Sequence, residues 1–204
     1  MQCYFCCRPC ANRFCLDCLT LCQPSFRLMP SLPNICLGGY FYGYNPVIRY
    51  MLHEVKFRFN FGLARLFRDY LKSFVLPGIF LDSDAIVCVR SHWFRQLFRG
   101  PSHLNYLFQP MIGDHVLSNY LVRSRYSRSS YRLSKKEREQ ALYFRHFRWN
   151  GPDEIHSVTV LDDICTSGST LIEIARLLKS HGIDTVKVLV LSYVDTTTIK
   201  SSLK

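Results

Sequence analysis

The chain has 204 residues, 48% of them hydrophobic, which suffices for one ordinary domain with a small appendage and excludes disorder of the whole chain. Its 26 Lys and Arg residues against 15 Asp and Glu residues give a formal net charge of +11, which favours an anionic partner; a basic protein that is merely soluble is the alternative. Because no stretch reaches the roughly 18 apolar residues of a membrane-spanning helix and no apolar secretory segment opens the chain, we expect no membrane insertion. We expect a reducing cytoplasmic location, with peripheral association at the inner face of the membrane as an open alternative.

Seven of the ten cysteines lie in the first 22 residues. Two C-x2-C pairs stand eight residues apart, and two such pairs can surround one ion as a tetrahedral tetrathiolate, which suits structural Zn²⁺. An iron–sulfur cluster is the alternative. Other cysteines nearby, at positions 7, 10 and 22, leave their own roles open. The predicted metal ligands are Cys3, Cys6, Cys15 and Cys18.

A proline-rich stretch follows the cysteines and predicts a linker, marked by Pro24, Pro30 and Pro33. We therefore divide the chain into a zinc-binding module with its linker, residues 1–33, and a second domain, residues 34–204.

The second domain begins with an aromatic and glycine-rich segment, Leu37 to Tyr44, which predicts strands around a turn. From Pro46 to Phe74 apolar residues recur at helical spacing, with basic residues on the polar side. Most of these basic residues fit a solvated helix face. Lys56 is set apart by the family resemblance described below.

A short apolar run, Ala85 to Val89, predicts a buried strand. Arg90 and Ser91 follow at its carboxyl end, which is where open α/β sheets bind ligands. The stretch from Trp93 to Gln109 then predicts a helix-containing segment interrupted by a Gly-Pro pair.

The segment from Arg123 to Arg148 is the most basic part of the chain, with nine Lys or Arg residues against two Glu residues. Between Ser124 and Ser134 arginine alternates with tyrosine and serine, a composition that contacts phosphates and stacks on bases. We predict a loop that closes over an anionic ligand; a solvated loop is the alternative.

A strand–loop–helix–strand unit occupies the C-terminal part. An apolar strand is predicted from His156 to Leu161, ended by two acids, and a helix from Leu171 to His181, capped by Gly182. The next strand runs from Thr185 to Val194, and a right-handed crossover makes the two strands parallel.

The loop inside this unit has the composition of a phosphate site. Small hydroxyl residues and a glycine lead into a helix N-terminus, where backbone N–H groups and the helix dipole favour an anion. The preceding carboxylates suit the hydroxyls of a ribose and could also hold Mg²⁺. It is neither a Walker loop nor a dinucleotide fingerprint. The predicted ligand residues are Asp162, Asp163, Thr166, Ser167, Gly168, Ser169 and Thr170. Cys165 beside them fits a small packed residue, and a redox role stays open.

This loop resembles that of the type I phosphoribosyltransferases and, more narrowly, of the ComF competence-protein family. The family's loop has four apolar residues, two acids, two apolar residues and T-T-G-x-T. Here Val158–Leu161 precede the acids, Ile164–Cys165 follow them, and Thr166–Thr170 complete the motif. A tetra-cysteine module in front of such a domain is also the order found in ComF-like proteins.

Shorter segments extend the resemblance over nearly the whole chain. A lysine–aromatic pair at a helix end is matched by Lys56 and Phe57, and an L-S-x3-R segment by Leu133–Ser134 and Arg138. The segment from Arg99 to His103 departs from the R-G-F-N-Q of the family.

The resemblance implies an α/β fold of type I phosphoribosyltransferase-like design, a mostly parallel sheet flanked by helices, with the small tetra-cysteine zinc module at its N-terminus. It implies phosphoribosyl pyrophosphate with Mg²⁺ as ligand, the phosphate on Thr166–Thr170 and the ribose on the acidic pair. The residues that it places near the pyrophosphate or on the closing loop are Lys56, Arg90, Ser91, Arg132 and Arg138.

Two functional hypotheses follow. The first is a competence protein of natural transformation that binds phosphoribosyl pyrophosphate and single-stranded DNA and contacts proteins of the DNA-uptake machinery. The alternative is an active phosphoribosyltransferase with an unknown acceptor, so whether the chain is an enzyme stays open.

Overall fold

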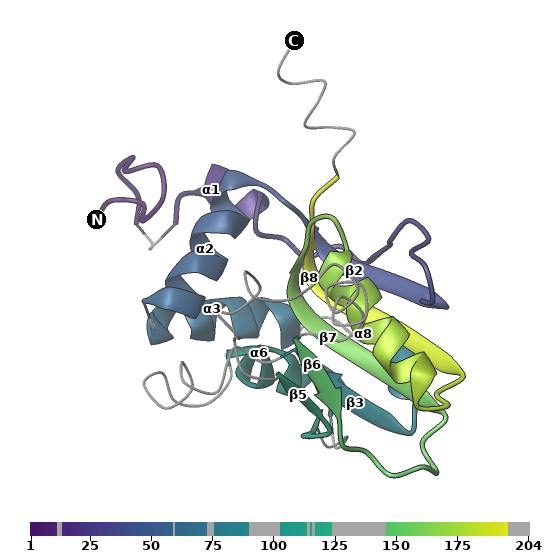
Figure 1. Ribbon diagram of the computed structural model, residues 1–204. Helices are drawn as coiled ribbons and strands as arrows, with labels where there is room; N and C mark the ends of the chain where they lie inside the picture. Colours follow the sequence, from purple (N-terminus) through teal and green to yellow (C-terminus); the bar gives the residue numbers. More distant parts are fainter. Residues whose placement is uncertain are drawn as a thin grey trace, which may run out of the picture.

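The computed structural model describes residues 1–11, 14–58, 60–72, 76–89, 103–113, 115, 117–123 and 146–195 (Figure 1). Within these residues a six-stranded sheet has the order β1-β2-β8-β7-β3-β4, in which β1 is antiparallel to β2 and all other pairs are parallel. The strands are β1 (Arg27–Leu28), β2 (Leu37–Gly43), β3 (Ala85–Cys88), β4 (Leu117–Ser118), β7 (Ser157–Cys165) and β8 (Thr185–Tyr193). A separate antiparallel ribbon pairs β5 (Leu121–Arg123) with β6 (Phe147–Trp149).

Helices cover both faces of the sheet (Figure 1). Alternate side chains of a strand point to opposite faces, so the central strands contribute to two apolar clusters. One cluster joins the sheet to α2 (Pro46–Phe57), α3 (Phe61–Lys72) and α6 (His103–Ile112), and the other joins it to α8 (Ser169–Ser180) and the β5–β6 ribbon. The short helices are α1 (Leu16–Thr20) and α4 (Gly78–Leu81). The structure therefore confirms the predicted fold class: a mostly parallel sheet between helices, preceded by a four-cysteine cluster.

Local sequence signals explain where α2 and α3 begin. The side chain of Asn45 accepts a hydrogen bond of 2.9 Å from the backbone N–H of Ile48, and Pro46 occupies the first helical position, where its missing N–H costs nothing. Asn60 repeats the cap by accepting from the N–H of Leu63 at 3.1 Å. The helical region predicted from Pro46 onwards is therefore two helices joined by a tight turn.

The cysteine module shares its core with α2. Cys3, Cys18 and Cys22 are buried in the same cluster as the α2 side chains. The Cys22 thiol lies 3.3 Å from the sulfur of Met51, and the Asn45 amide donates to the Leu21 carbonyl at 3.1 Å. Cys22 is thus a packing residue. The proposed domain boundary after residue 33 stays a prediction.

The predicted strands around a turn in Leu37–Tyr44 are wrong, because this segment is the single strand β2. Its glycines mark close packing. A Cβ built on Gly39 would lie 2.6 Å from the Phe26 ring and 3.1 Å from that of Phe80, so a side chain has no room there. The prediction that the acids end the strand before them is also wrong, since β7 continues through both to Cys165.

The other predicted elements of the described part are confirmed with small shifts in their ends. β3 and β8 lie where strands were expected, β8 pairs in parallel with β7, and Gly182 has a positive φ of 79° directly after the C-cap of α8. The segment before His103 and the basic residues between Arg123 and His146 lie outside the described residues. Among the residues described, none of the helices combines the length and apolarity needed to cross a bilayer.

Candidate functional site

The predicted phosphate loop joins the end of β7 to the start of α8. Thr166, Ser167, Ser169 and Thr170 are all exposed, and Ser169 and Thr170 are the first residues of the helix. The first backbone N–H groups of an α-helix have no partner within the helix, and the dipole adds positive potential at the same end. This loop therefore presents N–H donors and hydroxyl groups together to solvent, which suits a phosphate.

Gly168 gives the loop its shape. It is the N-cap of α8 with φ of 74° and ψ of 0°, a left-handed conformation that costs a residue with a side chain roughly 1–2 kcal/mol. A Cβ at this position would also lie 3.1 Å from the side chain of Leu32, in the segment between β1 and β2. Leu32 of the predicted linker thus lies beside Gly168, and the left-handed backbone conformation at this position favours glycine.

The two acids that precede the loop are buried, with Asp162 8% exposed and Asp163 6% exposed. A carboxylate oxygen of Asp162 accepts from the N–H of Asp163 at 2.8 Å, and one of Asp163 accepts from the N–H of Ile164 at 2.9 Å. Their side chains are close enough to affect each other's titration.

The acids differ in charge state. Burial, followed by the charge of Asp163, raises the pKa of Asp162 well above its usual range. Burial opposes ionisation of Asp163 too, but His103 and Lys56 outweigh it and hold the pKa of Asp163 below its usual range. The surroundings therefore favour the ionised form of Asp163 and the protonated form of Asp162.

Two side chains from helices on one face of the sheet approach Asp163. Lys56, in the last turn of α2, donates to its Oδ2, and Nε2 of His103, at the start of α6, lies 3.5 Å from the same oxygen. The structure thus brings Lys56 to the acidic pair, while its predicted place near a pyrophosphate stays a prediction. Sequence reasoning did not assign a role to His103. In the sequence, His103 stands where the R-G-F-N-Q segment of the family has its glutamine, and this polar position could have indicated a role for His103.

Cys165 lies next to the acidic pair as a buried residue. Burial, and then the charge of Asp162, raises its pKa to about 11. The thiol therefore stays protonated at neutral pH, which fits the expectation of a packed side chain.

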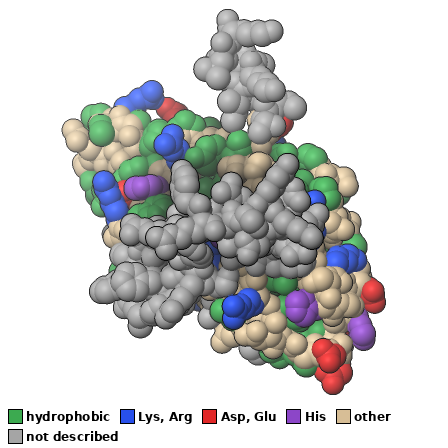
Figure 2. Space-filling view, viewed as in Figure 1, with side chains coloured by type: hydrophobic (Ala, Val, Ile, Leu, Met, Phe, Trp, Pro, Cys, Tyr) green, Lys and Arg blue, Asp and Glu red, His purple; other side chains and the backbone are tan. Residues whose placement is uncertain are grey.

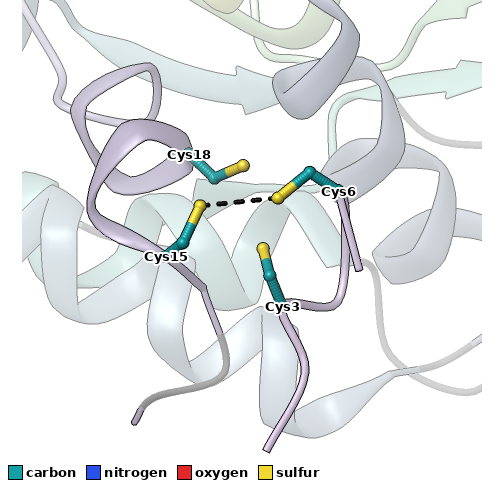
Figure 3. Close-up of side chains that lie close together, drawn as sticks. All are labelled: Cys3, Cys6, Cys15 and Cys18. Carbon is teal, nitrogen blue, oxygen red and sulfur yellow. Dashed lines mark hydrogen bonds between the residues drawn. The ribbon is translucent and has the colours of Figure 1, made fainter. Parts of the chain in front are cut away.

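The four cysteines predicted as metal ligands meet in one cluster (Figure 3). Their Sγ atoms all lie within 4.8 Å of one another, and those of Cys6 and Cys15 are 3.5 Å apart. Tetrahedral coordination with Zn–S bonds of about 2.3 Å would separate the sulfurs by about 3.8 Å, which this arrangement matches. Sulfurs at this spacing surround a single ion, which favours zinc over a multi-iron cluster.

The surroundings of the cluster shift the pKa values of its thiols in different directions. Burial opposes ionisation of Cys3, but backbone hydrogen bonds from Cys6, Cys15 and Phe5 outweigh it and lower its pKa to about 6. Burial raises the pKa of Cys18, and the neighbouring sulfurs add to that rise. A divalent cation at the centre would remove this repulsion between sulfurs, so the residues present fit a structural metal.

The remaining predicted site residues, Arg90, Ser91, Arg132 and Arg138, lie outside the described residues. Their placement near a pyrophosphate stays a prediction.

Comparison with known proteins supplies the family. The chain is 32% identical over 157 residues to the DNA utilization protein YhgH of Salmonella typhimurium, and 30% identical over 157 residues to that of Escherichia coli. It is 27% identical over 179 residues to Competence protein F of Haemophilus influenzae, a match that covers 85% of this chain and 76% of that relative. The chain belongs to the ComF competence-protein family.

This ComF-family chain covers 66% of the YhgH relatives, just under two thirds of their length, with 71% of its own residues. No family model matches the sequence. Among solved structures, adenine phosphoribosyl transferase from Trypanosoma brucei shares 15% identity over 87% of this chain and 78% of that chain, with a TM-score of 0.38. That similarity is too distant to place individual residues.

Proposed function

We propose that this ComF-family protein acts in DNA uptake, and that it binds phosphoribosyl pyrophosphate at the β7–α8 loop and single-stranded DNA on its basic surface. The observation that carries the ligand assignment is the juxtaposition of an exposed hydroxyl-rich helix N-terminus with a buried acidic pair. The names of the relatives, DNA utilization protein and Competence protein F, support the role in DNA uptake.

The chemistry of each part fits one part of the ligand. The N–H groups and hydroxyls of Thr166–Thr170 would take the terminal phosphate of the ribose. Asp162 and Asp163 would take the ribose hydroxyls, one as a protonated acid that can donate and the other as a carboxylate that accepts. Mg²⁺ would arrive with the pyrophosphate, because hard cations prefer phosphate and carboxylate oxygens.

Lys56 would have two functions in such a complex. Its contact with Asp163 keeps that carboxylate ionised, and its 31% exposed side chain leaves the ammonium accessible to the pyrophosphate. It would therefore lie between the acidic pair and the pyrophosphate of the ligand.

Calorimetry tests the ligand assignment. Phosphoribosyl pyrophosphate, ribose 5-phosphate and inorganic pyrophosphate are titrated separately, with and without Mg²⁺. We expect Asp162→Asn with Asp163→Asn to weaken the phosphoribosyl ligand at least about tenfold and to leave inorganic pyrophosphate little changed, since each charged hydrogen bond contributes about 1.5–3 kcal/mol. Asp184→Asn, on an exposed acid with 85% of its side chain accessible, is the control. Equal affinity of the double variant and the wild type would contradict the assignment.

Fluorescence anisotropy with a labelled oligothymidylate tests the DNA part. The net charge of +11 predicts an affinity that falls steeply as salt rises, because each neutralised phosphate releases counterions. Binding that is unmeasurable at moderate salt, or independent of salt, would exclude single-stranded DNA as a partner.

Transfer of the phosphoribosyl group is the second candidate function, and the complete loop motif with its ionised Asp163 favours it. Donors in the loop and Lys56 would stabilise charge on the two phosphate ends of the substrate. Release of pyrophosphate in the presence of a panel of free bases would establish turnover, and its absence with every base would leave binding as the activity.

A further inference from the structure

The corner between α2 and α3 exposes aromatic side chains beside the candidate site. Phe57, the last residue of α2, is 41% exposed, and Phe61, the first residue of α3, is 79% exposed. Both helices bury other apolar residues in the core, so these two rings are not needed to hold the helices on the sheet. Only residues 58–60 separate them, so chain length keeps their Cα atoms within roughly 14 Å of each other.

Basic side chains and a histidine lie near Phe57, the first of these rings. The Lys56 ammonium lies 5.8 Å from the centre of the Phe57 ring, and the His53 ring packs on Phe57 with centroids 4.9 Å apart. Arg58 has 70% of its side chain exposed and pairs with the buried Glu54 at 3.1 Å. Over α2, Figure 2 shows basic, acidic and histidine side chains next to hydrophobic ones. Exposed rings interleaved with cations suit an anionic ligand that has flat apolar faces.

This corner is continuous with the phosphoribosyl-type site through Lys56. The same ammonium that lies near the Phe57 ring also donates to the buried Asp163 carboxylate. A nucleotide whose sugar–phosphate bound at the β7–α8 loop would therefore have the Phe57 ring close by, because Phe57 directly follows Lys56, which contacts Asp163.

We infer that Phe57 and Phe61 form a stacking platform for the bases of single-stranded nucleic acid, beside the ribose-phosphate site. The inference rests on the proposed DNA binding and names its surface. Stacking on aromatic rings tolerates every base, and the neighbouring cations follow the backbone, which together give binding without sequence preference.

The test measures the affinity of the full-length protein for a labelled oligothymidylate of about 16 nucleotides by anisotropy, over a series of salt concentrations. We expect Phe57→Ala and Phe61→Ala each to weaken binding about fivefold to 100-fold, the range that corresponds to the loss of one stacked base. The slope of affinity against salt should not change, because stacking releases no counterions. Phe57→Tyr and Phe61→Tyr should retain wild-type affinity, since a tyrosine ring stacks equally well.

Ile79→Ala is the matched control, because Ile79 is a large apolar residue with 54% exposure on α4 and should bind as the wild type does. Wild-type affinity in the Phe57→Ala, Phe61→Ala double variant would overturn the platform and leave a protein-binding surface as its explanation. A loss that the tyrosine variants share would also overturn it, since stacking would not be the cause. Failure of the wild type itself to bind DNA would refute the proposed DNA binding, an outcome distinct from both.

Discussion

Replacement of Asp162 by asparagine should stabilise the folded protein and weaken its binding of the phosphoribosyl ligand. Asp162 is buried, and burial together with the charge of Asp163 raises its pKa. The folded protein therefore resists ionisation of this residue as the pH rises. Asparagine has the shape of the protonated acid, can still accept from the Asp163 N–H now bonded at 2.8 Å, and can donate to the ionised neighbour.

The size of the effect follows from the proton that the folded protein must take up at Asp162 when the unfolded chain is ionised. Each pKa unit of such a shift corresponds to about 1.4 kcal/mol, so a neutral isostere should stabilise the protein by about 1–2 kcal/mol. For a chain of this length, about 1 kcal/mol shifts Tm by roughly 2–4 °C, so we expect a rise of about 2–8 °C near neutral pH.

The raised pKa of Asp162 also determines how the stability difference between the variant and the wild type changes with pH. A raised carboxyl pKa stabilises the folded state below the unfolded value of about 3.9, and that stability is lost as the pH rises through the folded pKa. Asp162→Asn should therefore match the wild type near pH 4 and exceed it increasingly towards pH 8, as measured by thermal unfolding monitored by circular dichroism. Asp163→Asn should have the opposite effect and lower Tm, because Lys56 and His103 then lose the carboxylate beside them. The same sign for both variants would refute this account of the pair.

Three further predictions concern the other parts of the molecule. Removal of metal by a chelator, or Cys18→Ser, should lower Tm and remove one zinc per chain in elemental analysis, because the cluster shares its core with α2. Lys56→Met should lower the free energy of unfolding in urea by about 2–4 kcal/mol, because it leaves the buried Asp163 charge without its main partner. Gly168→Ala should cost about 1–2 kcal/mol from its left-handed φ and, by calorimetry, weaken the phosphoribosyl ligand about tenfold or more.

Regular patterns made much of the fold predictable. The α8 helix and its flanking strands follow from helical periodicity, apolar runs and Gly182, all of which act within a few residues. β1 was not predicted, because a strand of two residues has no periodicity to read. The glycines of β2 misled the prediction, because the rings that exclude a side chain at Gly39 come from Phe26 and Phe80 elsewhere in the chain.

The site was predictable in composition but not in its electrostatics. The place of the loop at the start of a helix and the convergence of the four cysteines follow from residue spacing. The opposite pKa shifts of Asp162 and Asp163 cannot be read from spacing, because the shift of Asp163 depends on a lysine 107 residues away and on a histidine from α6. Adjacent acids normally favour a solvated turn, so the sequence pattern alone placed them after the strand rather than inside it.

One feature that local reasoning misjudged also lowers stability. Asp162 is an acid buried beside another acid, and its ionisation opposes folding. A cost of this kind persists where a ligand requires the geometry. Gly168 follows six residues later, between the exposed Ser167 and Ser169, and tolerates its φ of 74° because it has no side chain. A buried acidic pair, a left-handed glycine and exposed hydroxyls within one strand-to-helix connection support the proposed ligand-binding role more strongly than the loop motif does by itself.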